Sequence, residues 1–184
     1  AASDVYKRQF FVGYFVVEVP SNMALERVGA RLWITRIMVT WGLLAAATCF
    51  VRGETSLYLL RFLLGVAEAG LFPGVILYFT YWFPSSWRIR AVAGFMTAIP
   101  IAGVIASPLS GVLLTWGDGL FGFRGWQVMF VLEGLAAVLF AVVVLIVLPD
   151  GPGRARWLAE PERAWIARTL AREEAGKPDP VSYT

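Results

Sequence analysis

The residues best able to do chemistry are Arg61 and Glu68, which stand inside an apolar run from residue 57 to residue 83. Seven residues are two turns of α-helix, so the two side chains share one face, about 10 Å apart along the axis. A charge in a membrane span costs about 2.5–3.5 kcal/mol on insertion scales and normally faces a protein interior or cavity. An arginine can hold a carboxylate by two hydrogen bonds, and a glutamate at that depth can carry a proton. We therefore predict an anion and proton site; the alternative is that each side chain only pairs with another helix.

The elements that would position these residues are membrane-spanning helices. Hydrophobic residues make up 58% of the 184-residue chain and charged residues only 16%, whereas a soluble domain carries roughly a quarter charged residues. A helix needs about 20 apolar residues to cross a bilayer. Four runs reach that length, and we interpret a fifth, shorter run as a further span; the five cover residues 33–51, 57–83, 91–116, 126–149 and 10–25. We predict an all-α, polytopic transmembrane helical bundle surrounded by membrane lipid.

The charges between the runs predict the orientation of the bundle. Two breaks and the segment after Asp150 are basic, whereas the alternate breaks hold one arginine each. Basic loops stay on the cytoplasmic side. We therefore expect a multi-pass protein of the inner (plasma) membrane, with the residues after 150 in the cytoplasm.

The two ends of the chain differ from the spans. Residues 1–9 have no apolar signal-peptide region and resemble a non-native leader; the alternative is a native loop. Residues 150–184 are expected to form a cytoplasmic loop. Within it, Pro161 and a one-sided set of apolar residues predict an amphipathic helix at about 161–175; a solvated linker helix is the alternative.

Several functions are disfavoured by residues that the sequence lacks. It has no histidine, and Cys49 is the only cysteine, so it offers no Ser-His-Asp or Cys-His catalysis and no thiolate or imidazole metal site. Residues 65–70 have the glycine spacing of a phosphate loop, but Leu71 and Phe72 replace its Lys and Ser/Thr. The basic residues form no aromatic-interleaved face for nucleic acid. We expect no enzyme, no cofactor, no metal and no nucleic acid partner.

Small residues mark where helices are expected to touch or bend. Small-residue ridges let helix backbones approach closely in lipid, and proline softens a helix. The candidates follow four-residue spacings within two of the spans: Gly70, Gly74, Gly103, Ser107 and Gly111, with Pro108 among them. We assign no role to Glu133, and for Glu18 a structural hydrogen bond is at least as plausible as proton coupling.

These motifs resemble the major facilitator superfamily. Residues 22–31 resemble the loop between its second and third helices, with Glu26 in place of the usual aspartate. Residues 61–70 and 103–111 resemble its fourth-helix and fifth-helix motifs. The resemblance implies helices two to six, part of the N-terminal half of a twelve-helix fold, with the remainder of the chain missing. It also implies a cytoplasmic gate formed in part by Glu26, Arg27, Gly29 and Arg31.

Longer strings are similar to the anion:cation symporter branch of that family, whose members transport tartrate, aromatic carboxylates and sugar acids. They are FFVGYFVVEVPSN, RFLLGVAEAGLFPGVILYFTYWFP and WQVMFVLEGL. The resemblance implies proton-coupled uptake of a small organic anion. It assigns charge coupling and proton binding to Arg61 and Glu68, and a place in the substrate site to Tyr14.

Two other interpretations stay open. An exporter or uniporter of the same fold would have similar motifs. A membrane-embedded enzyme or a non-transport membrane subunit belongs to a different class; the lack of histidine and of a carboxylate cluster disfavours the enzyme.

Overall fold

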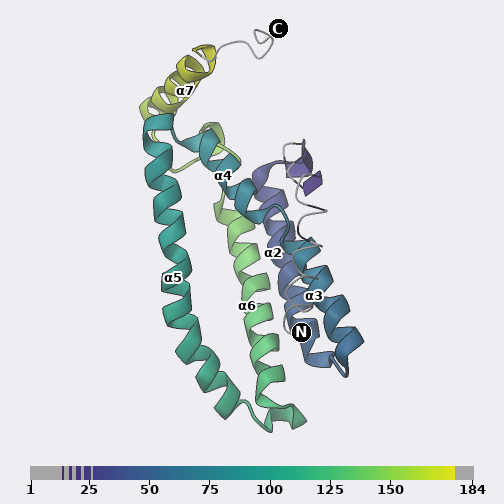
Figure 1. Cartoon of the computed structure of the whole chain (residues 1–184). Coiled ribbons are helices and arrows are strands. Elements are labelled where there is room, and N and C mark those ends of the chain that lie inside the picture. The colour runs from purple at the N-terminus through teal and green to yellow at the C-terminus, as the bar shows by residue number, and fades with distance from the viewer. Residues whose placement is uncertain (1–13, 15–16, 18–19, 22, 26, 177–184) are drawn as a thin grey trace.

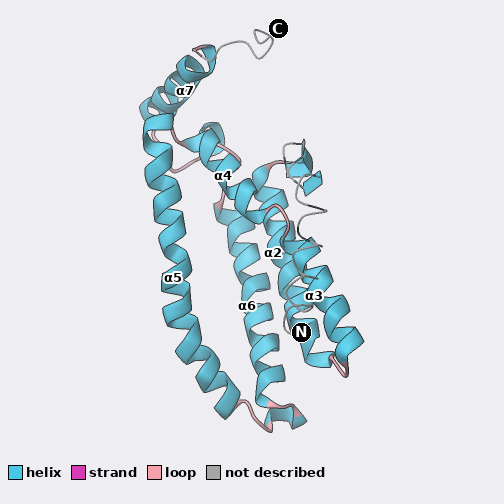
Figure 2. Cartoon of the chain, in the orientation of Figure 1, coloured by secondary structure: helices cyan, strands magenta, loops and turns pink. Residues whose placement is uncertain are grey.

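The computed structural model describes residues 14, 17, 20, 21, 23–25 and 27–176, and every regular element in that part is helical (Figures 1 and 2). Residues 1–9 and most of the expected span at 10–25 lie outside it. The described elements, in chain order, are α2 (Ala30–Ala47), η1 (Thr48–Phe50), α3 (Glu54–Glu68), α4 (Leu71–Trp82), α5 (Ser85–Trp116), η2 (Leu120–Gly122), α6 (Gly125–Val147), η3 (Pro152–Arg154) and α7 (Glu160–Ala175).

Four helical segments of the described chain are long and apolar enough to cross a membrane: Ala30–Phe50, Glu54–Trp82, Ser85–Trp116 and Gly125–Val147. The protein is therefore a membrane protein built as a helical bundle. One boundary differs clearly from the expected one, because α5 begins at Ser85 rather than at residue 91. Pro84 precedes the helix, and the backbone hydrogen bonds continue through the polar turn that follows it.

The expected continuous helix at 57–83 is interrupted between α3 and α4. Ala69 takes an extended ψ of 127° and Gly70 a left-handed φ of 87°. Pro73 explains why the break is stable, because it has no backbone N–H to donate to the carbonyl of Ala69, four residues before it. The span therefore consists of two helices joined at a glycine.

The closest helix pair is α2 with α6, which lie side by side in Figure 1. They approach at two glycines: an ideal Cβ on Gly42 would stand 2.6 Å from the carbonyl oxygen of Gly134, and one on Gly134 would stand 2.4 Å from that of Gly42. Close approach of this kind replaces the hydrophobic driving force that helices lack in lipid. The sequence analysis did not single out either glycine.

Helix α5 lies on the outer side of this bundle, away from α2 and α3 (Figure 1). It contacts α4 through Phe95, whose ring lies 6.1 Å from that of Phe72 and 6.0 Å from that of Phe79. It contacts α6 through a hydrogen bond of 2.8 Å from Ser110 Oγ to Glu133 Oε1. The intramembrane carboxylate of α6 thus has a hydroxyl partner in the neighbouring helix.

The segment after α6 folds back over one end of the bundle and leads into α7, which stands where the sequence favoured a helix at 161–175. The ring of Trp157 stacks on that of Trp82, with centroids 5.7 Å apart and planes 1° from parallel. At the far end of α7, both carboxylate oxygens of Glu173 accept the backbone N–H of Ser85 at 3.0 Å. The first N–H groups of a helix have no partner within it, so α7 caps α5.

Candidate substrate and proton site

Helix α3 places Arg61 and Glu68 on the side of the helix that faces the bundle. Leu64 and Gly65, which lie three or four residues from both of them and so on the same face, are buried. Arg61 and Glu68 themselves are half-buried. Glu68 is also the middle residue of the 29-residue span Glu54–Trp82. The structure thus brings both predicted residues to one inward face, with the carboxylate at the centre of the span.

Glu68 is the last residue of α3, so it stands directly at the helix break. The carbonyl that the break leaves free is satisfied from outside the helix: Ser21 Oγ donates to the Ala69 oxygen at 2.7 Å. Ser21 in turn accepts a hydrogen bond of 3.0 Å from Trp33 Nε1 at the start of α2. Ser21 is buried, with 2% of its surface exposed. Irregular backbone at membrane depth is tolerated where protein covers it in this way.

The third predicted site residue, Tyr14, is half-buried and has a helical backbone. Glu18 and Glu26, which the sequence analysis also named, lie outside the described residues.

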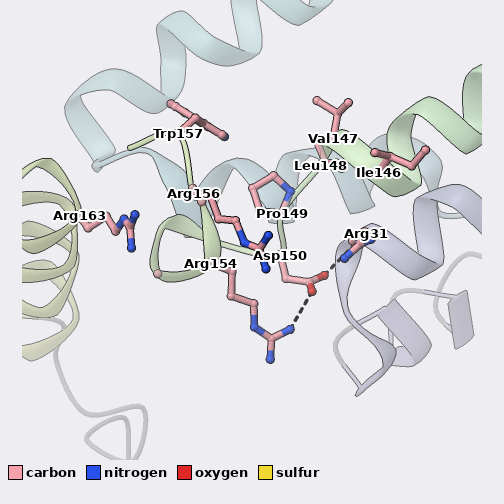
Figure 3. A pocket seen from close by; sticks show the side chains of 12 residues that line it. Arg31, Ile146, Val147, Leu148, Pro149, Asp150, Arg154, Arg156, Trp157 and Arg163 are labelled. Atoms are coloured by element: carbon pink, nitrogen blue, oxygen red, sulfur yellow. Dashed lines mark hydrogen bonds and ion pairs between the residues drawn. The ribbon is translucent and has the colours of Figure 1, made fainter. Parts of the chain in front are cut away.

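Two of the predicted gate residues, Gly29 and Arg31, lie beside Asp150 at the end of the bundle that carries α7, and the sequence analysis did not single out Asp150. Gly29 has a φ of 95°, and an ideal Cβ there would stand 3.2 Å from Asp150 Oδ1. The same oxygen accepts the backbone N–H of Arg31 at 3.2 Å, and Arg154 pairs with the other oxygen at 3.0 Å (Figure 3). Arg27 is exposed. Asp150 therefore joins the start of α2 to the loop after α6.

Only part of the predicted small-residue set meets a neighbour among the described residues. Gly74 packs against Leu25, whose Cδ1 would lie 2.5 Å from an added Cβ. Gly103 and Gly111 have open space within 4 Å of an added Cβ, and Ser107 and Pro108 are exposed. Helix α5 runs without interruption through its two prolines. A packing or bending role for the α5 residues stays a prediction.

The family model of the Major Facilitator Superfamily matches residues 9–178 of this chain. The chain belongs to the major facilitator superfamily. This confirms the resemblance that the loop and helix motifs indicated. It also places the helix break and the Gly29–Asp150 cluster within a fold whose members move solutes across membranes.

Three curated relatives are similar to this major facilitator chain along most of its length. A putative tartrate transporter of Agrobacterium vitis is 53% identical over 91% of this chain. The putative metabolite transport protein NicT of Pseudomonas putida is 48% identical over 95% of it, and a quinolone resistance transporter of Acinetobacter baumannii is 48% identical over 90%. The chain spans only 37–40% of the length of these relatives.

Proposed function

We propose that the protein containing this chain is a secondary active transporter that carries a small organic anion together with a proton. The observation that supports it most directly is the place of Glu68: on an inward face, at the middle of a span, and at the end of a broken helix. The similarity to a putative tartrate transporter supports a carboxylate as the substrate class. A tartrate-like acid, an aromatic carboxylate or a sugar acid would each fit.

In this proposal Arg61 binds the anion and Glu68 carries the proton. The guanidinium keeps its charge and can make two parallel hydrogen bonds to a carboxylate. A carboxylate that meets water in one conformation and is shut away from it in another binds and releases a proton as access alternates. The break after Glu68 supports the role, because two short helices joined at Gly70 can change their mutual angle more easily than one continuous helix.

We further propose that the α7 end of the bundle is cytoplasmic and that the membrane is the inner (plasma) membrane. The basic loops and the arginines after Asp150 support this orientation. The contacts of Gly29 and Arg31 with Asp150 would then belong to the cytoplasmic gate. A gate of this kind opens and closes by breaking and reforming a few polar contacts between packed elements.

Transport by the complete gene product that contains this chain tests the proposal. The purified protein would be placed in liposomes with an inward proton gradient, and accumulation would be measured for a panel of organic acids that begins with tartrate. We expect Glu68→Gln to lose gradient-driven accumulation but to keep exchange of labelled for unlabelled anion, because glutamine imitates the protonated side chain. The matched control is Glu54→Gln, at the exposed start of the same helix.

Accumulation by Glu68→Gln at the rate of the unaltered protein would contradict the proton role. Loss of exchange as well, in a protein that still folds, would assign Glu68 to anion binding instead.

The second candidate function is outward transport or uniport. One relative supports outward transport as a candidate, since its name refers to quinolone resistance. Proton-independent movement of the anion down its gradient in the same liposomes would support uniport. Extrusion of the anion driven by the same inward proton gradient, with protons entering as the anion leaves, would support an exporter.

A further inference from the structure

A pocket of about 670 Å³ opens at the α7 end of the bundle, outside the face that carries Arg61 and Glu68. It lies between the end of α6, the loop around η3, the start of α2 and the first turns of α7 (Figure 3). Four of the twelve residues that line it are arginines, and Asp150 is its one carboxylate. The pocket is therefore strongly cationic.

The four arginines divide into a fixed pair and an exposed pair. The Nε atoms of Arg31 and Arg163 donate to the carbonyls of Leu145 and Leu158, which holds their guanidinium planes. Nη1 of Arg163 also lies 3.8 Å from Oε2 of the exposed Glu160. Arg154 is 79% exposed and shares Asp150 at 3.0 Å, and Arg156 is exposed. A rigid guanidinium loses little entropy when it binds a planar or tetrahedral oxyanion. The pocket is thus prepared for a phosphate or carboxylate group.

Next to the arginines, the end of α6 contributes apolar side chains that are exposed. Ile146 at the end of α6 is 74% exposed. One and two turns earlier on the same stripe of α6, Val143 and Leu139 are 48% and 69% exposed. Trp157, which is 69% exposed and stacked on Trp82, is one of the residues that line the pocket. Exposed tryptophan side chains are typical of the interface between membrane and water.

We propose that this pocket binds the headgroup of an anionic phospholipid, whose acyl chains lie along the α6 stripe. Charge complementarity supplies the phosphate contacts, since each basic residue near an anionic headgroup contributes about fivefold in affinity. The apolar stripe continues from the pocket into the depth of the span, which suits a ligand with a long tail better than a free anion. Basic pockets between helices at the cytoplasmic surface are a known form of lipid recognition.

The bound lipid would add a further connection between elements that Asp150 and the Trp82–Trp157 stack already join. Arg31 belongs to α2, Arg154 and Arg156 to the loop, and Arg163 to α7. One headgroup held by all of them ties α7 and the loop to the bundle. The proposal thus goes beyond transport itself and concerns the lipid composition that the protein requires.

Native mass spectrometry of the complete gene product, delipidated and then titrated with phosphatidylglycerol or phosphatidylcholine, tests the proposal. We expect at least tenfold preference for phosphatidylglycerol. The Arg154→Gln/Arg156→Gln double variant should lose about twenty-five-fold in affinity, or about fivefold per arginine. Arg156→Gln alone, which leaves the Asp150–Arg154 ion pair intact, should lose about fivefold. This single variant keeps the test valid if the double variant folds poorly.

The matched control is Arg168→Gln/Arg172→Gln, which removes the same charge from α7 outside the pocket. Its affinity for phosphatidylglycerol should stay within about twofold. An equal loss in this control would overturn the pocket in favour of general surface charge. Equal binding of the two lipids would overturn an anionic ligand. Displacement of the lipid by millimolar inorganic phosphate would show a site for a soluble anion and overturn the lipid proposal.

Discussion

Replacing Gly134 by alanine should separate α2 from α6 and destabilise the bundle. The new Cβ would stand 2.4 Å from the carbonyl oxygen of Gly42 and 2.7 Å from the backbone N of Ala46. Both neighbours are backbone atoms, so neither can rotate away. An ordinary contact begins at about 3.4 Å, so the helices must move apart by about 1 Å.

The magnitude follows from that displacement. Overpacking of a closely packed interior costs about 1–3 kcal/mol, and a shifted interface also loses dispersion contacts along both helices. We expect Gly134→Ala to lower the free energy of unfolding by about 2–3 kcal/mol. Gly42→Ala should act in the same direction, and the double variant should cost less than the sum of the two, because the helices need to separate only once.

The assay is unfolding of the purified protein in mixed micelles, with the free energy extrapolated to zero denaturant. The control is Gly94→Ala in α5, where an added Cβ meets open space. This variant should be neutral or gain up to about 1 kcal/mol in helix propensity. If Gly134→Ala proved as stable as Gly94→Ala, the close glycine contact between α2 and α6 would be refuted.

Two further substitutions test other contacts by the same unfolding assay. Ser21→Ala should lower the free energy of unfolding by about 1–3 kcal/mol, because it leaves the Ala69 carbonyl at the helix break without its buried donor. The control is Thr97→Ala, which removes an exposed hydroxyl bonded within its own helix; equal stability of the two variants would contradict this. Gly29→Ala should also cost about 1–3 kcal/mol, because its φ of 95° lies in a region that other residues rarely adopt. Gly53→Ala, at a φ of −169°, is its control and should change stability little.

The sequence predicted what hydropathy and helical period control. Runs of apolar residues indicate spans because lipid admits few other structures. A separation of seven residues indicates a shared face because two turns of helix contain about seven residues. Arg61 and Glu68 accordingly lie on one inward face of α3, as expected. The family, too, could be inferred from the loop and helix motifs, and its model matches.

The sequence did not predict the contacts that depend on distant partners. The break after Glu68 was not predicted from Gly70 and Pro73, and the donor that stabilises it, Ser21, is 48 residues from Ala69 along the chain. Asp150 follows an apolar run and looks like an ordinary end of a span, and its role emerges only beside Gly29.

The two glycines at the α2–α6 crossing were missed for a different reason. Gly42 and Gly134 are single small residues in separate spans, without the four-residue glycine repeats that drew attention to other helices. Only the crossing of the two helices pairs them. In α5 the opposite holds. Small residues recur there every four positions, but an added Cβ on Gly103 or Gly111 would meet open space in the described part of the chain.

The central claim, that an anion and a proton move together with Glu68 as the proton carrier, is tested most directly by counting both in one experiment. Labelled substrate anion would be added to liposomes that contain the complete gene product and an internal pH dye, with no imposed pH gradient. Proton entry and anion entry would be recorded together. We predict that protons enter in fixed ratio with the anion. In Glu68→Gln the ratio should fall to background while anion exchange persists. Anion entry without proton entry in the unaltered protein, or an unchanged ratio in Glu68→Gln, would contradict the account.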